Sequence, residues 1–68
     1  MSIPIYSPIK LLTNRYLENG VKKGDYGVII EVYEDGYEVE FIDERGNTID
    51  WFSVKPDEVE MVEEAKTS

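Results

Sequence analysis

The stretch that most strongly indicates the fold is KKGDYGVIIEV, at residues 22–32. It combines a charged turn containing Gly24 and Gly27 with a run of β-branched residues, which favour strands. The dipeptide Asp35-Gly36 follows closely and is the strongest hairpin signal in the chain, so we expect a two-residue type I′ turn there and a returning strand over residues 37–43. The stretch therefore predicts antiparallel β-structure and says little by itself about function.

The remaining segments extend this β pattern in both directions. Residues 10–17 fit a short helix or a strand, and we favour a strand because Asn-Gly follows and the rest of the chain is β. A turn-forming segment at 44–47 precedes a strand at 48–54. Proline in the segment 55–58 suits a single 3-10 turn before a short last strand. The sequence predicts an all-β fold, a small five-stranded SH3-like partly open barrel with a 3-10 turn before the last strand.

A chain of 68 residues holds one domain. We expect residues 1–9 to form an extended N-terminal arm, residues 10–62 the barrel and residues 63–68 a frayed acidic tail. The sequence contains no cysteine and no histidine, which removes disulfides, thiolate metal sites and the commonest general base. With no signal peptide and no membrane-spanning segment in view, we expect a cytoplasmic location.

The charge balance indicates the kind of partner. Fifteen acidic residues and seven basic ones give a formal charge of −8, which repels phosphate backbones and anionic membrane surfaces. The same charge favours association with a basic partner protein. An equally acceptable interpretation is that the acidic residues only keep a small protein soluble. Nucleic acid and membrane partners are not favoured, and the sequence does not indicate an oligomeric state.

The predicted hairpins set a register in which Glu31 lies opposite Glu40 and Glu40 lies opposite Trp51. Because side chains alternate along a strand, one face would form the core, made of Val28, Ile30, Val32, Tyr37, Val39, Phe41, Phe52 and Val54. The other would hold Ile29, Glu31, Tyr33, Glu38, Glu40, Ile42, Ile49, Trp51 and Ser53. From the second face we select a partner-binding patch of acidic and aromatic residues: Glu31, Tyr33, Glu38, Glu40 and Trp51.

Two alternatives to this patch remain open. The N-terminal arm could cover it with Ile3, Ile5 or Ile9 and create a second small core. A one-residue bulge would exchange the two faces. A third interpretation takes Glu31 and Glu40 as a catalytic acid and base, but a small barrel has no deep cleft to shift their pKa values, and a solvated acidic face is favoured. We expect no enzymatic activity, no cofactor and no metal site.

Several segments together resemble a known family: Leu11-Leu12 and residues 21–25, 27–33, 36–41 and 54–59. They are similar to the small bacterial family called domain of unknown function 4926, over about residues 10–62. The chain has Val28 where threonine is expected, and Trp51-Phe52 where smaller apolar residues are common. The resemblance implies an SH3-like barrel with no assigned activity. The Lys-x-Gly-Asp-x-Gly turn is also similar to the KOW motif of ribosomal and transcription proteins.

Two functional hypotheses follow. The first is a small acidic protein-binding module, antitoxin-like or an accessory subunit, that engages a basic partner protein. The alternative is a KOW-like nucleic-acid-binding or ribosome-associated module acting through Lys22, Lys23 and Arg45. The alternative requires these three basic residues to gather on one positive patch.

Overall fold

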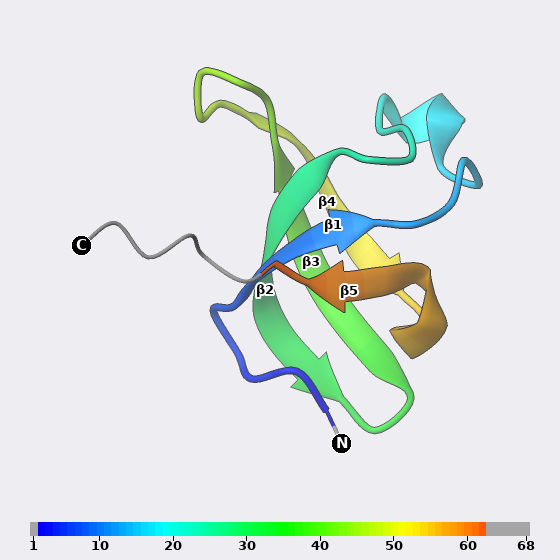
Figure 1. The fold of residues 1–68 in the computed structure, drawn as a ribbon, viewed down its shortest axis with the longest axis vertical. Coiled ribbons are helices and arrows are strands. Elements are labelled where there is room, and N and C mark those ends of the chain that lie inside the picture. Colours follow the sequence, from blue (N-terminus) through cyan, green and yellow to red (C-terminus); the bar gives the residue numbers. More distant parts are fainter. Residues whose placement is uncertain (1, 63–68) are drawn as a thin grey trace.

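Five antiparallel strands build a single sheet in the computed structural model, which describes residues 2–62 (Figure 1). The elements are β1 (Pro8–Leu11), the 3-10 turn η1 (Leu17–Asn19), β2 (Tyr26–Tyr33), β3 (Gly36–Ile42), β4 (Thr48–Val54), the 3-10 turn η2 (Pro56–Glu58) and β5 (Val59–Met61). The strand order is β4-β3-β2-β1-β5. The predicted all-β class and the 3-10 turn before the last strand are confirmed. The predicted tail at 63–68 lies outside the described residues.

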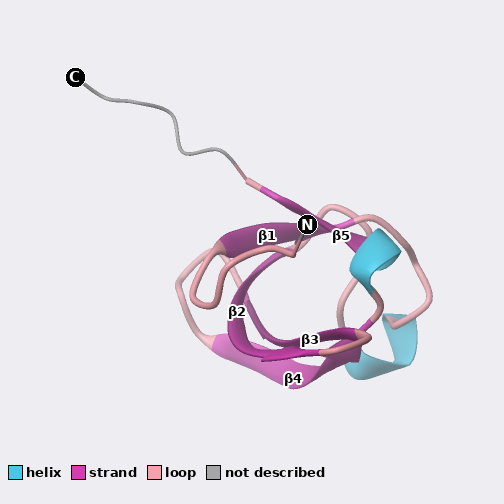
Figure 2. Cartoon of the chain, turned by 90° about the horizontal axis from the view of Figure 1, so that it is seen from below, coloured by secondary structure: helices cyan, strands magenta, loops and turns pink. Residues whose placement is uncertain are grey.

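The sheet curls into a partly open barrel. Figure 2 shows the strands curving around a common interior, with the two 3-10 turns beside the gap between β4 and β5. Strand β1 begins at Pro8, within the predicted arm, and ends at Leu11. The predicted strand over 10–17 is therefore wrong beyond Leu11, because the chain leaves the sheet and turns at Leu17–Asn19, where Gly20 takes a positive φ of 86°.

The β2–β3 hairpin differs from the prediction by its turn. Tyr33 pairs with Gly36, so the two turn residues are Glu34 and Asp35, and neither has the positive φ that a type I′ turn requires. Gly36 lies within β3 and does not have a positive φ either. A side chain at Gly36 would collide with the carbonyl oxygen of Val54 on β4. The glycine is therefore needed for close strand approach, and the predicted turn type is wrong.

A β-bulge at Ile30 then exchanges the faces of the first half of β2. Ile29 pairs with Val39 while Glu31 pairs with Glu38, which leaves Ile30 as the extra residue. Ile29 consequently joins the core at 0% exposure, although simple alternation placed it on the face opposite the core. Val28 and Ile30 are half-buried, so their assignment to the core was wrong.

A second irregularity lies between β3 and β4. Ile42 pairs with Thr48 rather than with Ile49, as the simple register predicted, and the shift falls between Phe41 and Ile42. Farther along, the predicted pairs of Val39 with Phe52 and of Glu40 with Trp51 are confirmed. The buried core comprises Ile9, Leu11, Val21, Ile29, Tyr37, Val39, Phe41, Val54 and Val59.

A polar cluster of Arg15, Tyr16 and Glu58 bridges the two 3-10 regions. The Tyr16 hydroxyl donates to Glu58 Oε1 at 2.5 Å, and Arg15 Nη1 lies 2.9 Å from Glu58 Oε2. The ring of Tyr16 also packs on Phe52 of β4, with centroids 4.7 Å apart. Burial opposes ionisation of Glu58, but the hydrogen bonds from Tyr16, from the Lys55 N–H and from Arg15 outweigh it and hold the pKa of Glu58 below its usual value. The cluster ties η2 to the loop before η1.

Candidate functional site: the outer face of strands β2 to β4

The register gathers the predicted site residues on one side of the sheet. Residues that pair across strands share a face. Glu40 has Trp51 as its partner on β4, and Glu38 lies between Glu31 on β2 and Ser53 on β4. Tyr33 ends β2 on the same side, where its hydroxyl reaches Glu38 Oε1 at 3.2 Å. We call this surface the outer face and define it by Glu31, Tyr33, Glu38, Glu40 and Trp51.

The aromatic residues of the outer face are open to solvent. Trp51 is 61% exposed and Tyr33 is 45% exposed. The N-terminal arm runs elsewhere: Ile3 packs against the core and its N–H donates to the Tyr37 hydroxyl at 2.9 Å. The alternative in which the arm covers Trp51 is therefore wrong. The large side chains of Trp51 and Tyr33 lie outside the core and are available for contact with another molecule.

The glutamates of the outer face lie close to one another. Glu31 lies opposite Glu38 rather than opposite Glu40 as predicted, because the bulge at Ile30 shifts the register. Glu38 Oε1 accepts a hydrogen bond from Ser53 Oγ at 2.9 Å, and Glu40 accepts one from Thr48. Desolvation, the charge of Glu38 and the hydrogen bond to it raise the pKa of Tyr33. Like charges in direct opposition destabilise a sheet, so this arrangement opposes folding locally.

The glutamates of the outer face form no ion pair within the described residues. The ion pairs found within residues 2–62 join Lys10 to Glu60, Arg15 to Glu58 and Lys22 to Asp25. None of them includes a glutamate of the outer face. The outer face therefore combines negative charge that the described part of the chain does not neutralise with exposed aromatic surface.

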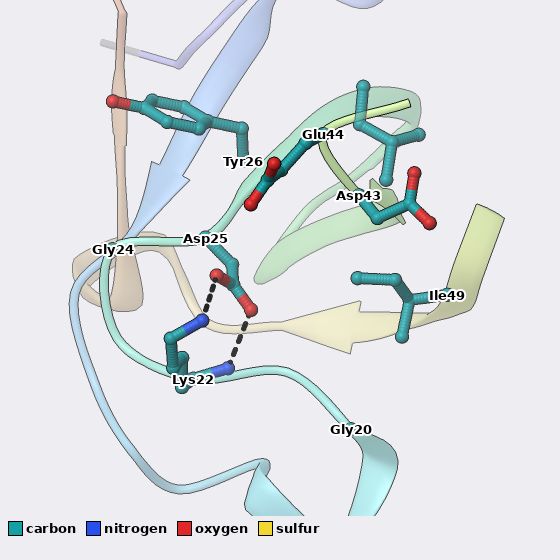
Figure 3. A pocket seen from close by; sticks show the side chains of 9 residues that line it. Gly20, Lys22, Gly24, Asp25, Tyr26, Asp43, Glu44 and Ile49 are labelled. Atoms are coloured by element: carbon teal, nitrogen blue, oxygen red, sulfur yellow. Dashed lines mark hydrogen bonds and ion pairs between the residues drawn. The ribbon is translucent and has the colours of Figure 1, made fainter. Parts of the chain in front are cut away.

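A hollow of about 420 Å³ adjoins the outer face at one end of the sheet (Figure 3). It is lined by Gly20, Lys22, Gly24, Asp25, Tyr26, Ile42, Asp43, Glu44 and Ile49. Tyr26 of β2 pairs with Ile42 of β3, and the next pair on the same side of the sheet is Val28 with Glu40. The hollow therefore adjoins the outer face at Glu40. No local sequence pattern predicts this hollow, because two turns that are distant in the sequence form its walls.

The carboxylates of the hollow have different roles. Asp25 accepts the N–H of Lys22 and lies 3.1 Å from its Nζ, which closes the turn before β2. Asp43 Oδ1 accepts the N–H groups of Arg45 and Asn47, each at 2.9 Å. Glu44 has no partner for its carboxylate within residues 2–62. The hollow therefore adds negative charge to this end of the sheet.

Two of the three basic residues of the nucleic-acid hypothesis, Lys22 and Arg45, lie among these carboxylates. Lys22 is paired with Asp25, and Arg45 follows Asp43 and Glu44 in one turn. The surroundings of Lys22 and Arg45 are therefore not a positive patch. Among the described residues, no group of three or more acidic, histidine or cysteine side chains is placed to hold a metal ion. No helix in that part of the chain is long and apolar enough to cross a membrane.

A family model described as a domain of unknown function (DUF4926) matches residues 6–61, which is most of the chain. No curated protein matches, and no solved structure matches. The family description names no activity, substrate or partner. The geometry of the outer face is consequently the main guide to function.

Proposed function

The chain belongs to the family described as a domain of unknown function (DUF4926), and we propose that it is a non-enzymatic protein-binding module whose outer face engages a basic partner protein. The observation that carries the proposal is the union of three glutamates with the exposed Trp51 and Tyr33 on one face. An antitoxin-like or accessory subunit in the cytoplasm is the role we propose for such a module.

Each component of the outer face has a part in the proposed binding. Trp51 and Tyr33 supply the apolar contact area, and truncation of a central aromatic anchor typically costs about 2 kcal/mol or more of binding free energy. The glutamates, within a chain of charge −8, steer a cationic partner and disfavour anionic ones. The repulsion between Glu31 and Glu38 would be relieved once a cation lies between their carboxylates. The free protein thus carries a repulsion that lowers its stability and that a basic partner would remove. This cost favours a role in binding over a role in solubility alone.

Affinity capture with matched baits tests this proposal. Wild-type protein and Trp51→Ala are compared with Leu17→Ala, whose side chain is 58% exposed against 61% for Trp51. Glu31→Gln is compared with Glu18→Gln, an exposed acidic residue of η1. Each bait is used at salt concentrations of about 50 mM and about 500 mM, because screening weakens exposed charge pairs.

We expect a basic protein to be retained by the wild type at low salt and released at high salt. It should be lost with Trp51→Ala, weakened with Glu31→Gln, and retained by both controls. Recovery of no basic protein, or equal recovery with Trp51→Ala and Leu17→Ala, would contradict the proposal. Recovery of nuclease-sensitive material dependent on Lys22 and Lys23 would instead support the nucleic-acid hypothesis.

A further inference from the structure

Strand β4 has one edge with no neighbouring strand in the described part of the chain. It is the end strand of the order β4-β3-β2-β1-β5, and it spans seven residues against three for β5 at the other end. An unpaired edge exposes backbone N–H and C=O groups that can pair with a strand from another molecule. Figure 2 shows this edge of β4 on the side of the gap.

A side-chain contact identifies the backbone groups that face outward. The Trp51 N–H donates to the Asp50 carboxylate, Oδ1, at 2.8 Å, so it points away from β3. In an antiparallel ladder, alternate residues bond to the neighbouring strand. Asp50, Phe52 and Val54 therefore bond to β3, while Trp51 and Ser53 direct their backbone groups to the free edge. Within residues 2–62 the Ser53 N–H donates to no acceptor outside the ladder.

The beginning of the edge is covered and the remainder is open. Asp50 Oδ2 accepts a hydrogen bond from Asn19 Nδ2 at 3.0 Å, which brings η1 over the start of β4. Beyond this point, both Trp51 and Ser53 are exposed. The open part of the edge thus coincides with the β4 side of the outer face.

We propose that the basic partner docks by adding an extended segment to β4 as a further strand, with backbone hydrogen bonds to Ser53. This inference rests on the proposed function and specifies its mode of binding. A partner residue opposite Ser53 shares the outer face, and because Ser53 is small, a lysine or arginine there reaches Glu38. A cationic residue opposite Trp51 lies over the indole, which favours cations at its face.

The charges select this occupant over a second copy of the chain. Pairing β4 with β4 of another copy would bring Asp50, Glu38 and Glu40 of one molecule towards those of the other. Between two molecules of charge −8 this contact is repulsive. A cationic extended segment has complementary charge and the same backbone hydrogen-bonding capacity.

Two synthetic peptides and two variants test strand addition. The probe is an acetylated, amidated peptide of alternating lysine and valine, and its control is the same peptide with N-methyl groups on alternate backbone nitrogens that would face β4. The control keeps every positive charge and loses the donors that pair with an edge. Ser53→Pro removes the outward N–H, a change that edge strands tolerate, and Ser53→Ala removes only the hydroxyl. Binding is measured by Trp51 fluorescence and by the amide resonance of residue 53 or its neighbours.

We expect the unmethylated peptide to bind the wild type and Ser53→Ala, and to bind Ser53→Pro about tenfold more weakly, since each factor of ten corresponds to about 1.4 kcal/mol. The N-methylated peptide should bind the wild type about tenfold more weakly as well, a comparison that needs no folded variant. Equal binding of the two peptides, or no binding of either, would overturn strand addition. A wild-type dimer that Ser53→Pro abolishes would overturn the choice of occupant. Capture of a basic protein that depends on Trp51 but not on Ser53→Pro would preserve the proposed function while rejecting this mode of binding.

Discussion

Replacing Tyr16 by phenylalanine tests whether the polar cluster at the gap stabilises the barrel. The change removes the hydroxyl that donates to Glu58 Oε1 at 2.5 Å and keeps the ring that packs on Phe52. A hydrogen bond to a charged group contributes about 1.5–3 kcal/mol. Because Tyr16 is half-buried, water replaces part of the lost bond, and we expect a decrease of about 1.5 kcal/mol in the free energy of unfolding at pH 7. For a domain of this size the melting temperature should then fall by roughly 6–12 °C.

The same variant should change the pH dependence of stability. Burial, the hydrogen bond to Glu58 and the charge of Glu58 raise the pKa of Tyr16 from 10.0 to about 12. A group whose pKa is higher in the folded state contributes stability that is complete below its unfolded pKa and is lost as the pH rises through its folded pKa. The difference in stability between the wild type and Tyr16→Phe should therefore be constant around neutral pH, where Glu58 is ionised, and close as the pH rises from 10.0 towards about 12.

Urea unfolding followed by circular dichroism measures both effects, with Tyr6→Phe as the control. Tyr6 is 71% exposed, so loss of its hydroxyl should leave stability within about 0.5 kcal/mol of the wild type. In the Glu58→Gln background, Tyr16→Phe should have a smaller effect, because the charged acceptor is already absent. A stabilising hydrogen bond from Tyr16 to Glu58 is ruled out if Tyr16→Phe is as stable as Tyr6→Phe at pH 7, or if the loss of stability in Tyr16→Phe persists unchanged to about pH 12.

Three further predictions concern the sheet. Gly36→Ala should destabilise the protein by more than Gly46→Ala, because the new Cβ at position 36 would collide with the Val54 carbonyl oxygen. At Gly46 the new Cβ meets no other atom, and the cost is the strain of a positive φ, about 1 kcal/mol. Equal urea midpoints for the two variants would contradict this. Trp51→Ala should leave the free energy of unfolding within about 0.5 kcal/mol of the wild type, and native Trp51 emission should be red-shifted and readily quenched by acrylamide; a blue-shifted, protected emission would remove Trp51 from the outer face. Glu31→Lys should stabilise the sheet by about 0.2–1 kcal/mol at low salt, because an attractive pair with Glu38 replaces a repulsive one, and should weaken partner capture; lower stability would contradict the observed register.

Local sequence patterns predicted much of the sheet, because strand propensity and turn chemistry act over a few residues. The apolar and polar alternation of residues 37–42 predicted which side of β3 is buried, and Tyr37, Val39 and Phe41 all lie in the core. The charge of −8 and the acidic and aromatic composition of the outer face were also evident from the sequence. Membership of Glu31 and Trp51 in that face followed from the same alternation.

The tertiary structure decided what alternation cannot encode. The bulge at Ile30 places Ile29 in the core, because curling the sheet into a barrel bends β2 at a point that no local pattern marks. The need for glycine at position 36 comes from the approach of Val54 on another strand rather than from a turn. Glu58 and Tyr16 lie 42 positions apart in the chain, and only the folding of the whole sheet brings the carboxylate and the hydroxyl into contact. The free edge beside Trp51 also depends on the tertiary structure, because the order of the strands in the whole sheet decides which strand lacks a neighbour.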